Sequence, residues 1–144
     1  MTALNAPEPT RRDAEQAALH PLVRRLVEER GLPYLDTLDE AALLDPRDHF
    51  LFLPAHGKTH LESPDIAAVL PELIAALGGP ARIGGAVAGP KLEAALRDRL
   101  QLALPALVVL RRGEPVGAVA RMRDWDEYLA RLGALIASAA PATH

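Results

Sequence analysis

Two carboxylates flank the start of a predicted helix, and their placement suggests binding chemistry. Glu62 and Asp65 surround Ser63-Pro64, a run typical of a helix start, with Ser63 as N-cap, a proline in the first position and an acid in the first turn. The free N–H groups and the dipole of such a start favour an anion by about 0.3–1 kcal/mol. The carboxylates either cap the helix and are solvated, or form an acidic patch for a cationic partner. The residues alone favour capping.

A second acidic group lies near the C-terminus, beside two aromatic side chains. Asp124 and Glu127 have capping-box spacing, and Asp126 lies between them. Carboxylates around Trp125 and Tyr128 would suit a peptide-binding surface. Trp125, the only tryptophan, falls on the apolar stripe of the predicted helix, so we expect it in the core. Capping and core packing are therefore the favoured roles for Asp124 and Trp125.

Three histidines raise the question of a metal site. His49, His56 and His60 lie within twelve residues of each other. Two histidines four residues apart share a metal when both lie on one helix, but Gly57 places His56 and His60 in a predicted loop. No third ligand follows from the spacing. We predict no metal site and no cofactor, and keep a metal-handling role for these histidines as the alternative function.

Composition excludes several classes of protein. The 144-residue chain has no cysteine, so it has no disulfide, thiol nucleophile, redox pair, iron–sulfur cluster or zinc–thiolate site. A net charge of −3 argues against a nucleic-acid partner. No apolar run is long enough to span a membrane, and Arg11-Arg12 precedes acidic residues instead of the apolar run of an export signal. We therefore expect a cytoplasmic protein with no membrane insertion.

Periodicity and turn signals predict strands that alternate with helices, then a hairpin and a closing helix. Residues 1–12 are expected to be a disordered tail, 13–139 one domain, and 140–144 a frayed end. Within the domain, Pro21 is a candidate first residue of a helix, with a looser turn before it. The other expected elements are strands at 32–35, 49–53, 81–88, 106–110 and 116–120, and helices at 37–44, 63–77, 90–100 and 124–139.

This order predicts an α/β fold, in which helices cover both faces of a mixed sheet. Pro115 cannot donate a ladder hydrogen bond, so the last strand is expected at a sheet edge. Pro71 lies inside the helix at 63–77, where it should cause a kink.

The order of elements resembles the thioredoxin fold: a three-layer α/β/α arrangement with a mixed central sheet and a C-terminal β-hairpin plus helix. Three local features carry this resemblance. They are Pro71 in the helix after the central strand, Leu104-Pro105-Ala106 at the entry to the hairpin, and Gly113 in its turn. In thioredoxin-like proteins the proline at the Pro105 position is cis, and the resemblance implies the same here.

A closer resemblance is to the HyaE/HupG family of hydrogenase expression proteins. Residues 65–73 read DIAAVLPEL, similar to the DVAVVLPEL segment of that family. The C-terminal run from Pro105 through Gly113, Gly117 and Arg121 to 124–129 also resembles it. The family is thioredoxin-like, lacks the redox cysteines and assists maturation of uptake nickel–iron hydrogenases. It is thought to bind the twin-arginine signal peptide of the small-subunit precursor, and the resemblance implies that role here.

The resemblance also implies where a partner binds. Counted back from Pro71, the positions of the thioredoxin cysteines hold Ser63 and Ile66, or Glu62 and Asp65 if the loop shifts by one residue. Disulfide exchange needs a thiolate, so thioredoxin chemistry is excluded in either register, and we predict no enzyme. Carboxylates here would face an arginine pair, with charge-assisted bonds. The candidate partner-binding residues are Glu62, Ser63, Asp65, Glu72, Pro105, Asp126 and Glu127.

Partners and alternatives follow from the same residues. The expected partner is the hydrogenase small-subunit precursor, with other maturation factors as further candidates. An extended peptide has two places to bind: the outer edge of the last strand, or the groove between Ser63 and Pro105, which we prefer because Pro115 hinders edge pairing. A cysteine-free enzyme that binds glutathione beside Pro105 is a third class, without an activated nucleophile or acid–base pair to support it.

Overall fold

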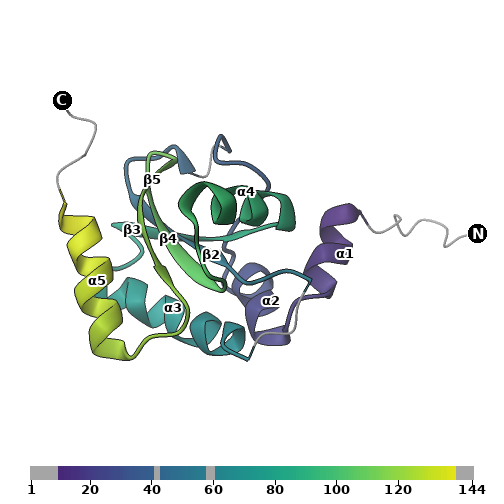
Figure 1. Ribbon diagram of the computed structural model, residues 1–144, viewed down its shortest axis with the longest axis horizontal. Helices are drawn as coiled ribbons and strands as arrows, with labels where there is room; N and C mark the ends of the chain where they lie inside the picture. The colour runs from purple at the N-terminus through teal and green to yellow at the C-terminus, as the bar shows by residue number, and fades with distance from the viewer. Residues whose placement is uncertain (1–9, 41–42, 58–60, 139–144) are drawn as a thin grey trace, which may run out of the picture.

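The computed structural model describes residues 10–40, 43–57 and 61–138. This part of the chain contains five helices and five strands, and Figure 1 shows how they are arranged. The helices are α1 (Arg11–Ala17), α2 (Pro21–Glu28), α3 (Ser63–Leu77), α4 (Pro90–Leu100) and α5 (Trp125–Ala137). The strands are β1 (Tyr34–Leu35), β2 (Asp48–Leu53), β3 (Ile83–Ala88), β4 (Ala106–Arg111) and β5 (Glu114–Ala120).

The strands form one mixed sheet in the order β1-β3-β2-β4-β5. β1, β3 and β2 are parallel, whereas β4 is antiparallel to both β2 and β5. β2 is central, and its residues 50–53 are apolar and buried on both faces, as expected for a strand between two helical layers. β5 lies at the edge, which confirms the expectation drawn from Pro115, and the β4–β5 register shifts at Val109/Leu110.

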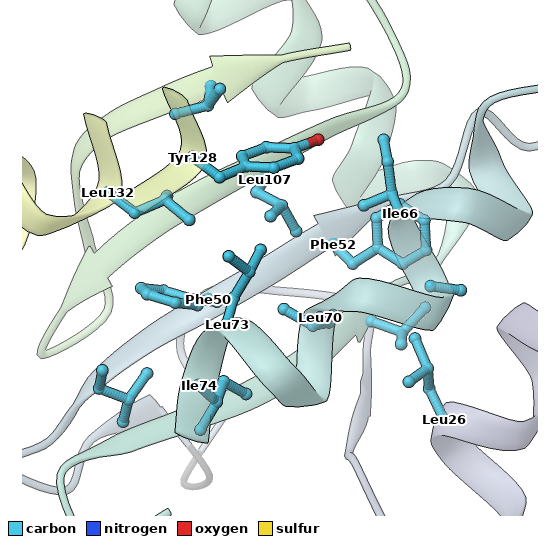
Figure 2. Packing of buried hydrophobic residues seen from close by; sticks show 14 of the residues in the cluster. Leu26, Phe50, Phe52, Ile66, Leu70, Leu73, Ile74, Leu107, Tyr128 and Leu132 are labelled. Carbon is cyan, nitrogen blue, oxygen red and sulfur yellow. The ribbon is translucent and has the colours of Figure 1, made fainter. Parts of the chain in front are cut away.

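Alternating side chains divide the core into two layers. Phe50 and Phe52 point toward the face covered by α2, α3 and α5, where Ile66, Leu70, Leu73 and Tyr128 meet them (Figure 2). Leu51 and Leu53 point to the other face, which α4 covers with Leu92 and Leu96. The predicted three-layer α/β/α architecture is therefore confirmed.

The closing helix α5 is fastened to the sheet at its C-terminal end by one arginine. The Arg111 guanidinium donates from Nε to Asp48 Oδ1 at 3.0 Å and from Nη2 to Asp48 Oδ2 at 2.9 Å, pairing the end of β4 with the start of β2. The same side chain donates to the carbonyl oxygens of Ile136 at 2.9 Å and Ser138 at 3.1 Å. These two carbonyls lie at the end of α5, where backbone acceptors lack intrahelical partners.

Part of the predicted N-terminal tail is helical. Thr10 and Asp13 form a reciprocal capping box that starts α1, a signal missed in the sequence. The Tyr34 hydroxyl donates to Glu15 Oε1 at 2.9 Å, and Arg12 lies 5.3 Å from the centre of the Tyr34 ring. These contacts attach α1 to β1. Pro21 starts α2, as predicted. Residues 1–9 and 140–144 lie outside the described residues.

Residues 37–40 do not form the start of the short helix expected at 37–44. Glu40 Oε2 instead accepts from the N–H groups of Asp36, at 2.6 Å, and Thr37, at 3.2 Å. The carboxylate thus accepts from the backbone N–H groups of the turn after β1, and residues 36–40 are turns and bends. Residues 41–42 lie outside the described part. Among the described residues, no helix is long and apolar enough to cross a membrane.

Candidate functional site

The start of α3 differs from the expected serine cap. Ser63 is the first helical residue and is buried, and its hydroxyl donates to the carbonyl oxygen of Pro54 at 2.8 Å. Glu62 occupies the N-cap position but makes no side-chain cap bond. The prediction that Ser63 caps the helix is therefore wrong. Its buried hydroxyl instead connects α3 to the residue that follows β2.

The Glu62 carboxylate is engaged by the segment that follows β5. Arg121 donates to it from Nε at 2.9 Å and also from Nη2, and the Met122 N–H donates to Oε1 at 2.8 Å. This bidentate pair raises the pKa of the Arg121 guanidinium, chiefly through the hydrogen bonds to Glu62. Glu62 therefore holds the β5–α5 connection against α3.

Arg121 also joins the proline loop to α5. The Leu104–Pro105 peptide bond is cis, as the thioredoxin resemblance implies. The Arg121 N–H donates to the Pro105 carbonyl oxygen at 2.7 Å, and the Arg121 carbonyl accepts from the Tyr128 hydroxyl at 2.8 Å. Arg121 has a left-handed backbone, with φ of 68°, so its carbonyl, amide and side chain reach three different elements. Burial raises the pKa of the Tyr128 hydroxyl, which stays a donor.

The other acidic residues predicted to bind a partner differ in whether they are exposed or already paired. Asp65 and Glu72 are both exposed on α3, about two helical turns apart. Asp126 is exposed on the first turn of α5, whereas Glu127 is shared with Arg131 at 3.0 Å and Arg123 at 3.9 Å. The structure thus connects Glu62 and Pro105, because Arg121 bonds to both. The first turn of α5 follows Arg121 closely in the sequence. Glu72 lies farther along α3.

Two large apolar side chains are exposed on the segments that the Glu62–Arg121 pair joins. Leu61 is 86% exposed and Trp125 is 41% exposed. The expectation that Trp125 lies in the core is wrong, because it is the first residue of α5 and the buried positions belong to Tyr128 and Leu132. Asp124 caps α5 as predicted, accepting from the Glu127 N–H at 2.9 Å.

A buried glutamate orders the loop before α3. Glu93 on α4 accepts from the N–H groups of Ala55 at 2.7 Å and His56 at 2.8 Å. Ala55 is left-handed, with φ of 68°, and the two bonds hold this uncommon turn. Burial raises the pKa of the Glu93 carboxyl. Glu93 is not among the site residues predicted from the sequence, although its place beside Leu92 and Leu96 on the helical stripe could have indicated burial.

The histidines do not form a metal centre in the described part of the chain. His56 Nε2 lies 2.7 Å from the Ala88 carbonyl oxygen, and its ring meets Tyr34 edge-on. His49 is buried at the start of β2, and His60 lies outside the described residues. No group of three or more His, Cys, Asp or Glu side chains among the described residues is arranged to hold a metal ion.

A mixed five-stranded sheet between two helical layers, with a cis-proline loop beside the start of α3, defines a thioredoxin-like protein. The solved structure of mitochondrial thioredoxin 3 from Saccharomyces cerevisiae agrees in fold, with a TM-score of 0.53 at 14% identity over 74% of this chain and 94% of that one. The chain belongs to the HyaE family: residues 22–128 match the sequence model described as hydrogenase-1 expression protein HyaE.

Curated relatives agree with this family. The chain is 37% identical over 122 residues to the hydrogenase expression/formation protein HupG of Rhodobacter capsulatus, covering 83% of this chain and 87% of the relative. It is 36% identical over 124 residues to the hydrogenase expression/formation protein HoxO of Azotobacter vinelandii, covering 83% and 80%. The family resemblance found in the sequence is therefore confirmed, and it supports a role in hydrogenase maturation.

Proposed function

We propose that this protein is a non-catalytic chaperone in the maturation of an uptake nickel–iron hydrogenase, and that it binds the small-subunit precursor through the twin-arginine signal peptide. Its membership of a family of hydrogenase expression proteins is the observation that carries the maturation role. The chain has no cysteine, and thiol–disulfide exchange requires a thiolate, so the thioredoxin-like scaffold serves binding and not redox chemistry.

The proposed binding surface consists of Leu61, Asp65, Trp125, Asp126 and Glu127, on both sides of the Glu62–Arg121 pair. A twin-arginine signal peptide combines an arginine pair with an apolar stretch. Exposed carboxylates at Asp65 and Asp126 suit guanidinium groups, with which they form charge-assisted hydrogen bonds. The exposed side chains of Leu61 and Trp125 suit the apolar stretch.

Glu62, Ser63 and Pro105 support this surface from below. An arginine of the partner would have to displace Arg121 to reach both oxygens of Glu62, because Arg121 already binds them. We therefore assign Glu62 the role of positioning the β5–α5 connection, with Pro105 bonded to the same residue through its carbonyl. Glu72 extends the acidic face along α3 for a longer segment of the precursor.

Capture of the precursor tests this proposal. The purified protein is immobilised and presented with small-subunit precursor that carries or lacks its signal peptide. We expect capture of the full precursor only, weakened by salt because exposed charge pairs are screened within about 8–10 Å at moderate ionic strength. Equal capture of both forms would contradict signal-peptide binding.

A pair of charge reversals tests the surface itself. Asp65→Lys with Asp126→Lys should reduce capture roughly tenfold or more, because each reversal replaces attraction by repulsion. The matched control is Glu28→Lys with Asp98→Lys, which changes the net charge equally at exposed positions on α2 and α4. Equal loss in both double variants would mean that only the overall charge matters.

A further inference from the structure

A pocket lies at the opposite end of β2 from the start of α3. It has a volume of about 370 Å³ and lies between the end of α2, the middle of α3 and the first residues of β2 and β3. His49, the second residue of β2, lines it, whereas Ser63 bonds to Pro54 beyond the last residue of that strand. The pocket therefore belongs to a different site from the proposed partner-binding surface.

His49 is buried in this pocket without a hydrogen bond. The residue is 1% exposed, and neither ring nitrogen has a hydrogen-bond partner among the described residues. The nearest carboxylate oxygen, Asp45 Oδ2, lies 3.6 Å from Nε2, beyond a normal hydrogen bond. Burial lowers the pKa of His49, so the ring is neutral near pH 7 and offers one donor and one acceptor. Buried polar atoms nearly always have a partner, so these nitrogens point to a bound group.

Gly84 makes room for the polar side chains of the pocket. It is the register partner of His49 on the neighbouring strand. A Cβ atom at Gly84 would lie 2.5 Å from His49 Cδ2 and 3.3 Å from Arg47 Cζ. The bare backbone of β3 therefore lets the imidazole and the guanidinium lie against it on the face of the sheet that Leu51 shares. Leu32 and Ile74 lie against the opposite face, beside Gly85, so the two groups line the pocket from the two faces of β3.

The edge of β3 is open beside the pocket. β1 pairs only with Val87 and Ala88, and the N–H groups of Val87 and Gly89 point outward to the carbonyls of Pro33 and Leu35. Alternate residues of a strand direct their N–H groups to the same side, so the Gly85 N–H faces this open edge. Gly85 also lines the pocket, which adds a backbone donor to it.

The charge of the pocket favours an anion. Arg47 donates to Asp45 Oδ2 at 2.9 Å, and these hydrogen bonds lower the pKa of Asp45 to about 2, so the two charges cancel. Arg30 adds one positive charge at the rim, while Leu32 and Ile74 supply an apolar wall. One net positive charge, a neutral imidazole and a backbone N–H beside an apolar wall suit a carboxylate with a compact apolar body.

We propose that this pocket binds a small organic carboxylate, whose anionic group meets Arg30, His49 and the Gly85 N–H, and whose apolar body packs on Leu32 and Ile74. The volume falls in the range of about 300–1,000 Å³ of small-molecule sites. Such a carboxylate comes either from a free small molecule or from the C-terminus of a peptide.

Nuclear magnetic resonance with benzoate as the probe tests the proposal. Benzoate should shift the His49 ring and Gly85 amide signals in a saturable way, whereas the neutral isostere benzamide should not. Arg30→Gln should weaken benzoate binding roughly tenfold, the usual effect of losing one charge-assisted contact. The matched control Arg99→Gln, on exposed α4, should leave it unchanged. His49→Phe keeps an aromatic ring in the core and should abolish the response, with folding verified by circular dichroism.

The outcomes separate the alternatives. No saturable shift, an equal response to benzamide, or unchanged binding in Arg30→Gln overturns the proposal and leaves His49 to a buried water. N-acetyl-leucine, compared with its amide, distinguishes the source of the carboxylate. Tighter binding of N-acetyl-leucine than of benzoate assigns the pocket to a peptide C-terminus, and the reverse assigns it to a free small molecule. A failure of this protein to capture the precursor would not affect the benzoate result, because the pocket at His49 and the proposed partner-binding surface are separate sites.

Discussion

The side chains of Glu62 and Arg121, separated by 59 positions in the sequence, form a bidentate ion pair that joins the start of α3 to the end of β5. Glu62 stands where the sequence predicts an acid for a partner's arginine, yet the chain supplies that arginine itself. The pair fixes the connection between β5 and α5, so the surface around it depends on this contact.

The first prediction concerns that pair. Glu62→Gln and Arg121→Gln should each lower the melting temperature, because either change removes the charge-assisted bonds between the two side chains. The double variant should lower it by little more than one single change, since the contact can be lost only once. Thermal unfolding of the four proteins measures this, and strictly additive shifts would contradict the coupling.

A second prediction tests the link from Arg121 to α5. Tyr128→Phe removes the hydroxyl that donates to the Arg121 carbonyl in a site where the tyrosine is 1% exposed. The unfolding free energy should fall by about 0.5–1.5 kcal/mol, the net contribution of one intramolecular hydrogen bond. Urea unfolding measures it.

The control for that variant is the same chemical change at Tyr34, whose hydroxyl donates to Glu15. Tyr128→Phe should also weaken precursor capture, because it loosens the segment next to Trp125. Tyr34→Phe should leave capture unchanged, because Tyr34 lies under α1 and outside the proposed surface. If Tyr34→Phe weakened capture as much as Tyr128→Phe, the Arg121–Tyr128 bond would have no special role in binding.

Glu93 gives a prediction about pH. Burial raises the pKa of the Glu93 carboxyl above its ordinary value near 4.5. When the pKa of a group is higher in the folded state than in the unfolded state, its contribution to the unfolding free energy is full below the unfolded-state pKa. That contribution is lost as the pH rises through the folded-state pKa. The unfolding free energy should therefore decrease above about pH 4.5 by an increment that Glu93→Gln lacks.

Urea unfolding at several values between about pH 4 and pH 7 measures this difference. At neutral pH, Glu93→Gln should cost about 1–3 kcal/mol, because its amide can no longer accept from both backbone N–H groups. The matched control is Glu114→Gln, at an exposed position on β5. Parallel pH profiles for the wild type and Glu93→Gln would show that another group causes the slope.

Trp125 predicts a fluorescence signal for partner binding. As the only tryptophan, and 41% exposed, it dominates the emission and reports on its own surroundings. Emission should shift to shorter wavelength when the precursor covers α5, and Trp125→Ala should weaken capture several-fold with a small change in stability. An unchanged emission maximum with saturating precursor would exclude Trp125 from the interface.

The close approach of β3 to His49 predicts a sharp difference between two glycine substitutions. Gly84→Ala should cost about 1–3 kcal/mol, because its Cβ would lie 2.5 Å from His49 Cδ2. Gly133→Ala, in helix α5, places its Cβ 3.6 Å from Leu77 and should be stabilising by about 0.5–1 kcal/mol. Adding His49→Ala to Gly84→Ala should remove most of the cost of the alanine, and denaturant unfolding would detect a failure to do so.

The architecture could be predicted from the sequence because its signals are local. Short apolar runs bounded by turn signals marked the strands, Pro21 marked the start of α2, and Asp124 marked the start of α5. Pro115 indicated the sheet edge from its missing N–H alone. Residues 37–40 do not form the start of the helix expected at 37–44, because a Thr-x-x-Glu spacing also fits a turn in which the glutamate caps free N–H groups. Glu40 does so here.

The site was harder to predict, because its bonds connect residues that are distant in sequence. Arg121 bonds to Pro105, Glu62 and Tyr128, and no periodicity reveals such a set. The predicted burial of Trp125 was wrong because the apolar pattern of α5 allows either its first residue, Trp125, or its fourth residue, Tyr128, to lie on the buried face. Only the packing of Tyr128 decides between the two.

Helix α5 is held at both ends. The Tyr128 hydroxyl attaches its first turn to the Arg121 carbonyl, and the Arg111 guanidinium binds the carbonyls of Ile136 and Ser138 at its last turn. A helix secured in this way cannot slide or rotate without breaking bonds at one end. The surface that Trp125 and Asp126 present is therefore preorganised, and a partner that docks there loses little affinity to the ordering of this protein.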